Sequence, residues 1–191
     1  MSESWVRLRA SALDSISELK ELLADESADD RRLIGAYLEA KQALADAFEA
    51  FSVEKYMDPA ILVRAKESIE TAMHSAYAGL PAKYLKLHGF GKSHARLLAY
   101  LCLSAGVEVS GAELRMLTGD AVHTERRARE LRDLGFTLEA RHTGGADMYV
   151  LRDTEPDTSA GAAIQVAKNI REDRSSSSEE KDRLLQVTGL G

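Results

Sequence analysis

The sequence is poor in cysteine, in proline and in long apolar runs. Its single cysteine, Cys102, rules out an internal disulfide, and no stretch approaches the ~18 uninterrupted apolar residues of a membrane span. The first ten residues contain no apolar run followed by a small-residue cleavage site, so we expect no signal peptide. These absences argue against a disulfide-rich secreted protein and against a membrane-spanning one, and they predict a cytoplasmic protein.

Catalytic and metal-binding motifs are also missing from the sequence. No pair among the five histidines has the spacing of a zinc site, and one cysteine cannot complete such a site. The patterns HExxH and GxSxG, and the phosphate-binding pattern GxxxxGK followed by Ser or Thr, do not occur. Cys102 lies in the apolar run 97–103, which is typical of a buried thiol and not of a nucleophile. We therefore predict no catalytic site, no metal and no other cofactor in this chain.

The charge of the chain is unevenly distributed. The formal net charge is −6, which taken alone argues against a nucleic-acid-binding protein. Residues 1–82 contain nine basic and fifteen acidic side chains, and residues 153–191 contain five and eight. Residues 83–152, with eleven basic and eight acidic side chains, are the only segment with a basic excess. A polyanionic partner is therefore expected to bind there.

The first 80 residues are predicted to be helical. Up to residue 78 they contain one glycine and one proline and are rich in Ala, Leu and Glu. Apolar residues recur every three or four positions and predict helices at about 3–24, 30–52 and 59–80. We expect these helices to pack as an antiparallel bundle or hairpin in residues 1–80. We also expect a homodimer formed through an apolar stripe on the first helix, made of Trp5, Leu8, Ile16 and Leu19.

The middle segment, 81–152, shows a pattern typical of a winged helix–turn–helix. The expected elements are, in order, a helix at 93–105, a short strand at 107–109, helices at 110–119 and from Asp120 or Thr124 to Leu134, and strands at 136–141 and 147–151. The second helix begins with an S-x-x-E capping box at Ser110, and Gly144 and Gly145 predict the turn of a β-hairpin. The expected fold class is thus mainly α, with a small β-hairpin wing after an N-terminal helical bundle.

The third helix of this segment and the wing contain the candidate DNA contacts. Projected at about 100° per residue, the helix places its core residues on one side and several arginines on the other. The candidate DNA-binding residues are Val122, His123, Thr124, Arg126, Arg129 and Arg132 on or beside this helix, and Arg141 and His142 in the wing. The alternative is a solvated face with surface ion pairs, Arg126 with Glu130 and Arg129 with Asp133.

The residues available for reading bases favour guanine. Residues 83–152 contain no asparagine or glutamine, the side chains whose amides read adenine in the major groove. Arginine presents two donors that match the O6 and N7 acceptors of guanine, so Arg126 and Arg129 predict a preference for G·C pairs. Val122 could contact the methyl group of thymine or methylcytosine. We expect Arg141 and His142 to meet phosphate or the minor groove, where they position the protein without specifying sequence.

Three short segments of this region resemble a known family. They are VSGAELRMLTG at 109–119, ERRARELRDLG at 125–135 and YVL at 149–151. They resemble, in order and spacing, the winged-helix module that precedes the nuclease domain in bacterial HNH-type restriction endonucleases. The resemblance covers about residues 93–152 and implies recognition of double-stranded DNA. His123 and Thr124 stand where that family often has an acidic residue and a tryptophan, and the histidines and cysteines of the nuclease domain are absent.

The last segment, 153–191, is expected to be a linker and a helical tail. In the family a similar helix leads into the nuclease domain, so the end at Gly191 is interpreted as a truncation or a loss of that domain; the alternative is a disordered acidic tail. The leading hypothesis is the DNA-recognition part of an HNH-type restriction endonuclease. The alternatives are a dimeric winged-helix transcriptional regulator and a winged helix used for protein–protein interaction.

Overall fold

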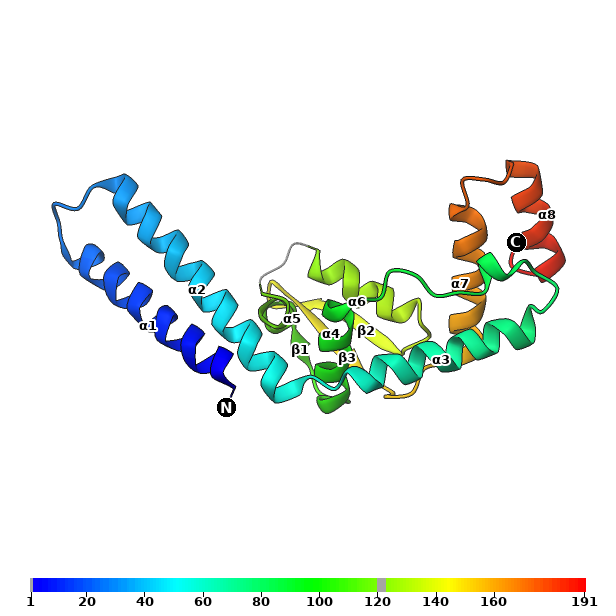
Figure 1. Ribbon diagram of the computed structural model, residues 1–191, viewed down its shortest axis with the longest axis horizontal. Helices are drawn as coiled ribbons and strands as arrows, with labels where there is room; N and C mark the ends of the chain where they lie inside the picture. Colours follow the sequence, from blue (N-terminus) through cyan, green and yellow to red (C-terminus); the bar gives the residue numbers. More distant parts are fainter. Residues whose placement is uncertain (1, 120–122) are drawn as a thin grey trace.

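The computed structural model describes residues 2–119 and 123–191, and its described part is mainly helical with one small sheet (Figure 1). The helices are α1 (Glu3–Ala24), α2 (Asp30–Tyr56), α3 (Pro59–Ala76), α4 (Lys92–Leu103), α5 (Gly111–Leu117), α6 (Thr124–Arg132), α7 (Thr158–Glu172) and α8 (Ser178–Thr188), with a single 3-10 turn, η1, at Ala82–Tyr84. The strands are β1 (Val109–Ser110), β2 (Leu138–Thr143) and β3 (Ala146–Leu151). In the described part of the chain, no helix is long and apolar enough to cross a membrane.

Helices α1 and α2 form an antiparallel hairpin that extends from one end of the molecule (Figure 1). Each begins at a polar cap: the Ser2 hydroxyl accepts the Trp5 N–H, and the Asp29 carboxylate accepts the Arg32 N–H. The buried residues of the hairpin are mostly small, namely Ala12 and Leu22 in α1 and Ala36, Ala40, Ala47 and Ser52 in α2. The two helices can therefore approach closely, but they bury little large apolar side chain between them.

In the part of the chain that the structure describes, helix α3 does not join this hairpin. Of the two expected arrangements, a hairpin is seen for α1 and α2, and a bundle of all three helices is not seen. Helix α3 lies against α4 and α7 instead. Ile69 and Met73 are fully buried in that contact, and Leu62 and Ala65 are nearly so. The spacing of apolar residues every three or four positions correctly predicts a buried face on α3. Such a spacing does not indicate which other element packs against that face.

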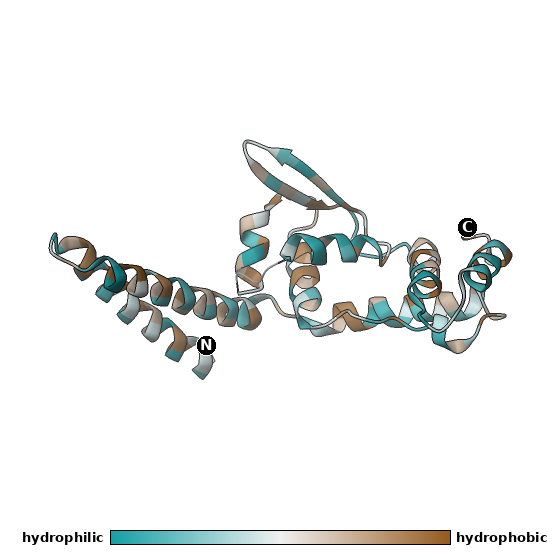
Figure 2. Ribbon diagram, turned by 90° about the horizontal axis from the view of Figure 1, so that it is seen from above, coloured by the Kyte–Doolittle hydropathy of each residue, from teal (hydrophilic) through white to brown (hydrophobic). Residues whose placement is uncertain are grey.

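The middle of the chain folds around a three-stranded antiparallel sheet with strand order β1-β3-β2. Strand β3 pairs with both neighbours, Tyr149 opposite Val109 in β1 and Leu151 opposite Leu138 in β2. Gly144 and Gly145, both at positive φ, form the expected turn between β2 and β3. Figure 2 shows these two strands projecting from the body of the protein.

The starts of α5 and α6 differ in how they are capped. The expected capping box of α5 is confirmed, because Ser110 Oγ accepts the Glu113 N–H at 3.2 Å and the Glu113 carboxylate accepts the Ser110 N–H at 2.8 Å. For α6, the cap is His123, at a left-handed φ of 70°, and Thr124 is the first helical residue. The expected cap at Thr124 is therefore wrong by one residue, and Asp120, the other candidate, lies outside the described residues.

Helix α7 closes the core, and its first turns lie at very short range from residues 134 and 135, which follow α6. Val166 and Ile170 of α7 are fully buried. Gly135 has a φ of 89°, and a Cβ there would lie 2.2 Å from the Asp157 carbonyl oxygen; a Cβ at Gly161 would lie 2.6 Å from the Leu134 carbonyl oxygen. The C-terminal segment is thus packed helix, and the alternative of a disordered tail is wrong for it.

Candidate nucleic-acid interface

Helix α6 is strongly amphipathic. Thr124, Ala128 and Leu131 are buried, whereas Arg126, Arg129 and Arg132 are exposed. The projected core side of this helix is therefore confirmed. Helix α6 packs against β2, a strand of the hairpin that projects from the body of the protein in Figure 2.

The residues at the start of α6 are placed differently from one another. His123 is exposed, whereas Thr124 is only 1% exposed and its hydroxyl lies 2.8 Å from the Thr118 hydroxyl. Thr124 thus links the start of α6 to Thr118, the residue after α5, from within the core, which does not suit a contact with a base. Val122 lies outside the described residues.

The arginines of α6 differ in their ion pairs. Arg126 Nε donates to Glu130 Oε1 at 3.0 Å, which is the surface pair that the alternative reading expects. Among the described residues, Arg129 and Arg132 form no ion pair, so the expected pair of Arg129 with Asp133 is not observed. Burial raises the pKa of Asp133, because the charged carboxylate is partly desolvated and the opposing charge of Lys168 is a smaller effect.

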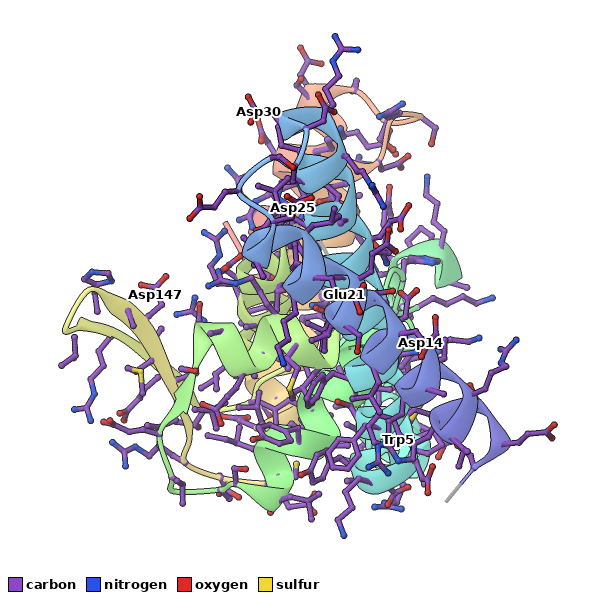
Figure 3. The ribbon with its side chains drawn as sticks, turned by 90° about the vertical axis from the view of Figure 1, so that its left-hand side faces the viewer. Trp5, Asp14, Glu21, Asp25, Asp30 and Asp147 are labelled. Atoms are coloured by element: carbon purple, nitrogen blue, oxygen red, sulfur yellow. The ribbon has the colours of Figure 1, made fainter. Side chains whose placement is uncertain are left out.

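The wing residues are exposed and paired with carboxylates. Arg141 on β2 forms an ion pair with Glu108, and His142 Nδ1 lies 2.8 Å from Asp147 Oδ1 across the hairpin. Figure 3 shows Asp147 on the projecting hairpin, far from α1 in that view. A shallow groove of about 370 Å³ joins the wing to α6, and its lining residues are Glu125, Arg129, Ala140, Arg141, His142, Asp147 and Tyr149. The structure therefore brings Arg129, Arg141 and His142 together around one groove.

A buried histidine lies behind α6, and the sequence gives no sign of its role. His94 in α4 has its Nε2 2.8 Å from Glu130 Oε2. Although burial opposes ionisation, the hydrogen bonds from His94 and Arg126 hold the pKa of Glu130 below its usual value. The two residues are 36 positions apart, and only the packing of α4 on α6 brings them together.

A larger cavity, of about 580 Å³, lies on the other side of α6, between it, α7 and the segment after η1. Its charged and aromatic lining includes Lys83, Tyr84, His88, Phe90, Arg126, Glu130, Lys168, Glu172 and Asp173. The Lys83 ammonium, with the Ser175 N–H and the Tyr84 hydroxyl, holds the pKa of Asp173 well below its usual value. Two ion pairs lie in this wall, Lys83 with Asp173 and Arg126 with Glu130.

No candidate catalytic or metal-binding cluster stands out in the described residues. They contain no group of three or more His, Cys, Asp or Glu side chains placed to hold a metal ion. Burial raises the pKa of the Cys102 thiol to about 11, which suppresses the thiolate that a nucleophilic cysteine requires.

The fold and the site define a mainly helical protein with a small three-stranded antiparallel sheet and a basic helix beside a projecting hairpin. The sequence model of a family described as the KpnI N-terminal domain matches residues 94–157, about a third of the chain. The match suggests a domain related to restriction enzymes, and it spans most of α4, then α5, α6 and all three strands. No curated protein and no solved structure matches the chain.

Proposed function

We propose that residues 81–152 bind double-stranded DNA as a winged helix–turn–helix, with α6 as the recognition helix and the β2–β3 hairpin as the wing. The observation that carries the proposal is the groove in which Arg129 of α6 lies beside Arg141 and His142 of the wing. The element order α4, β1, α5, α6, β2, β3 and the strand order β1-β3-β2 support it, because a winged helix presents its last helix to the major groove and its hairpin to the flanking backbone.

The electrostatics of this surface suit a polyanion. Arg129 and Arg132 have no ion pair among the described residues, so they can meet phosphate or base edges without first losing a carboxylate. The pairs of Arg141 with Glu108 and of His142 with Asp147 are exposed. Exposed pairs of this kind stabilise a protein by only ~0–1 kcal/mol, so a DNA phosphate can replace the carboxylate.

Sequence preference on this proposal comes from Arg126 and Arg129. Both are exposed on α6, and each can offer two donors to the O6 and N7 acceptors of guanine. Each such contact contributes roughly 1–3 kcal/mol of discrimination. His123 and Arg132 flank them, whereas the buried Thr124 acts by supporting the start of the helix. A methyl contact by Val122 remains a prediction from the sequence.

The biological role that fits best is the recognition part of an HNH-type restriction endonuclease, acting in the cytoplasm. The match to the KpnI N-terminal domain supports this over a transcriptional regulator, since it connects the same residues to restriction enzymes. A winged helix used for protein–protein interaction is distinguished by salt, because binding to phosphates weakens steeply as salt is raised.

We also propose that the chain forms a homodimer through the α1–α2 hairpin. The surface for it is not the expected stripe, because Trp5, Leu8 and Leu19 are half-buried within the monomer, and Trp5 packs on Phe51 of α2 at 5.3 Å between ring centroids. Of the expected stripe only Ile16 is exposed. The hairpin exposes seven further apolar side chains, namely Val6, Leu13, Leu23, Ile34, Tyr37, Leu38 and Phe48. Exposed apolar side chains gathered on one helical hairpin suit an interface, and DNA readers of this type commonly bind as two-fold dimers.

The test of DNA binding uses the full chain, because α3 and α7 pack against the middle segment. Binding to duplex fragments of genomic DNA, with and without cytosine methylation, is measured by gel shift over a range of salt. Arg126→Glu together with Arg129→Glu should abolish binding while the helical circular dichroism stays unchanged. A double variant that binds as well as the parent would show that α6 is not the recognition helix.

A further inference from the structure

A chain of hydrogen bonds links the core to the exposed side chain of Arg126. His94, in the first turn of α4, is 5% exposed, and its Nε2 lies 2.8 Å from Glu130 Oε2. Glu130 Oε1 accepts a hydrogen bond from Arg126 Nε at 3.0 Å. The Arg126 side chain is itself 70% exposed. A buried group thereby fixes one end of a side chain that points into solvent.

The hydrogen bond made by Nδ1, the second ring nitrogen of His94, determines which of the two ring nitrogens carries the proton. The Gly91 N–H donates to His94 Nδ1 at 3.3 Å, so Nδ1 is the acceptor and neutral His94 carries its proton on Nε2. That Nε2–H is then the donor to Glu130. The Phe90 ring packs edge-on against the imidazole, with 5.2 Å between ring centroids. Backbone and aromatic contacts thus hold the imidazole, and the imidazole holds the Glu130 carboxylate.

The carboxylate in turn decides which nitrogens of Arg126 remain for a ligand. Nε is already a donor to Glu130, whereas Nη1 and Nη2 have no hydrogen-bond partner among the described residues. These two nitrogens form a planar fork that matches the O6 and N7 acceptors of guanine. A guanidinium without such a tether is free to turn toward the nearest phosphate, where its contact would carry no sequence information.

We propose that Glu130 is a positioning residue for DNA recognition, one that orients the Arg126 fork toward a guanine and keeps it from the phosphates. This inference rests on the proposed function, because it requires α6 to enter the major groove. Glu130 also places a negative charge beside the DNA. Its removal should therefore strengthen binding to arbitrary sequences while it weakens the preference for guanine.

The experiment compares the full-length parent with Glu130→Gln on a pool of duplexes that have a randomised core. His94 and Arg126 contact different oxygens of the Glu130 carboxylate. In glutamine an NH2 group takes the place of one of these oxygens, so one of the two N–H donors then faces a donor instead of an acceptor. We expect the enrichment of guanine at one base pair to fall by roughly fivefold or more, and binding to the unselected pool to increase. The matched control is Asp133→Asn, which removes the same charge from the end of the same helix. It should increase binding to the pool without a change in guanine enrichment.

A double variant separates positioning from a merely structural role. If Glu130 acts through Arg126, Glu130→Gln should leave guanine enrichment unchanged when Arg126→Ala is already present. A loss of the same size in both backgrounds, or equal enrichment in the parent and in Glu130→Gln, overturns the positioning role and leaves DNA binding intact. A parent chain that binds no duplex overturns the proposed function and this inference together. Thermal unfolding of each variant shows that the compared chains are folded.

Discussion

Arg129 and Arg141 line the same groove from different elements, and we predict that their replacement by alanine has two different effects on DNA binding. On the proposed function Arg129 lies on the recognition helix, so Arg129→Ala should remove roughly 1–3 kcal/mol of discrimination at one base pair. Arg141 lies in the wing, so Arg141→Ala should weaken binding to every sequence alike. It should also reduce the slope of log K against log salt by ~0.9 for each protein copy bound.

The structure indicates that neither change should disturb the fold. Arg129 is in no ion pair among the described residues. Arg141 and Glu108 are 62% and 41% exposed, and such a pair stabilises the protein by only ~0–1 kcal/mol. The melting temperatures of both variants should therefore lie close to that of the parent. A change in binding then reports on the contact with DNA and not on unfolding.

The assay is fluorescence anisotropy with two labelled duplexes, one selected from a random pool by the parent and one with the same bases scrambled. Over a roughly fourfold range of salt, the loss of one phosphate contact changes the salt effect on affinity by about threefold. Arg129→Ala should reduce the affinity ratio between the two duplexes, and Arg141→Ala should leave that ratio unchanged. The opposite result, with base preference lost only in Arg141→Ala, would refute the assignment of α6 as the reading element.

Three further predictions concern stability, assembly and reactivity. Gly135→Ala should lower the free energy of unfolding by roughly 3 kcal/mol or more, because the added Cβ would collide with the Asp157 carbonyl oxygen. Gly145→Ala, at a similar positive φ but with open space around it, should lower the free energy of unfolding by about 1–2 kcal/mol. Equal losses of the two variants in chemical denaturation would contradict the close contact at Gly135. At a protein concentration on the order of tens of micromolar, well above typical dimer dissociation constants, the parent should sediment as a dimer. Leu13→Glu on the hairpin should yield monomers, whereas Val187→Glu on α8 should not, and a monomeric parent would exclude the proposed dimer. Cys102 is half-buried, less than the sequence predicts, and its pKa is still raised to about 11. A thiolate-specific reagent at pH 8 should therefore label the folded chain roughly a hundredfold more slowly than the unfolded chain, and equal rates would show that the fold does not desolvate the thiol.

Local signals in the sequence predicted much of the secondary structure. The expected first helix, 3–24, agrees with α1 (Glu3–Ala24), because Ser2 caps it and the polar run after Ala24 ends it. The capping box at Ser110 and the turn at Gly144 and Gly145 were equally predictable, since each depends on residues close together in the chain.

Contacts between distant residues were not predictable in this way. Helix α3 packs on α4 and α7 and not on the α1–α2 hairpin. The helical period of apolar residues identifies the buried face of α3, but it does not identify the helix that packs against this face. The sequence predicts Thr124 as a candidate DNA contact, and only its burial and its hydroxyl contact with Thr118 show that it faces inward. The contact of His94 with Glu130 crosses two helices, so no spacing in the sequence could have revealed it.

The length of α2 sets a geometric condition on DNA recognition by two copies. Its 27 residues span about 40 Å, and the middle of the molecule is attached near the C-terminal part of that length, where Arg96 of α4 pairs with Glu49. If two copies meet along the outer part of the hairpin, each α2 is a rigid spacer between the dimer contact and the middle of its own chain. On the proposed function the two α6 helices are then held at a fixed separation, and the DNA repeat that this separation has to match is about 34 Å. A bound site should accordingly contain two inverted elements whose spacing tolerates a change of one full turn far better than a change of half a turn.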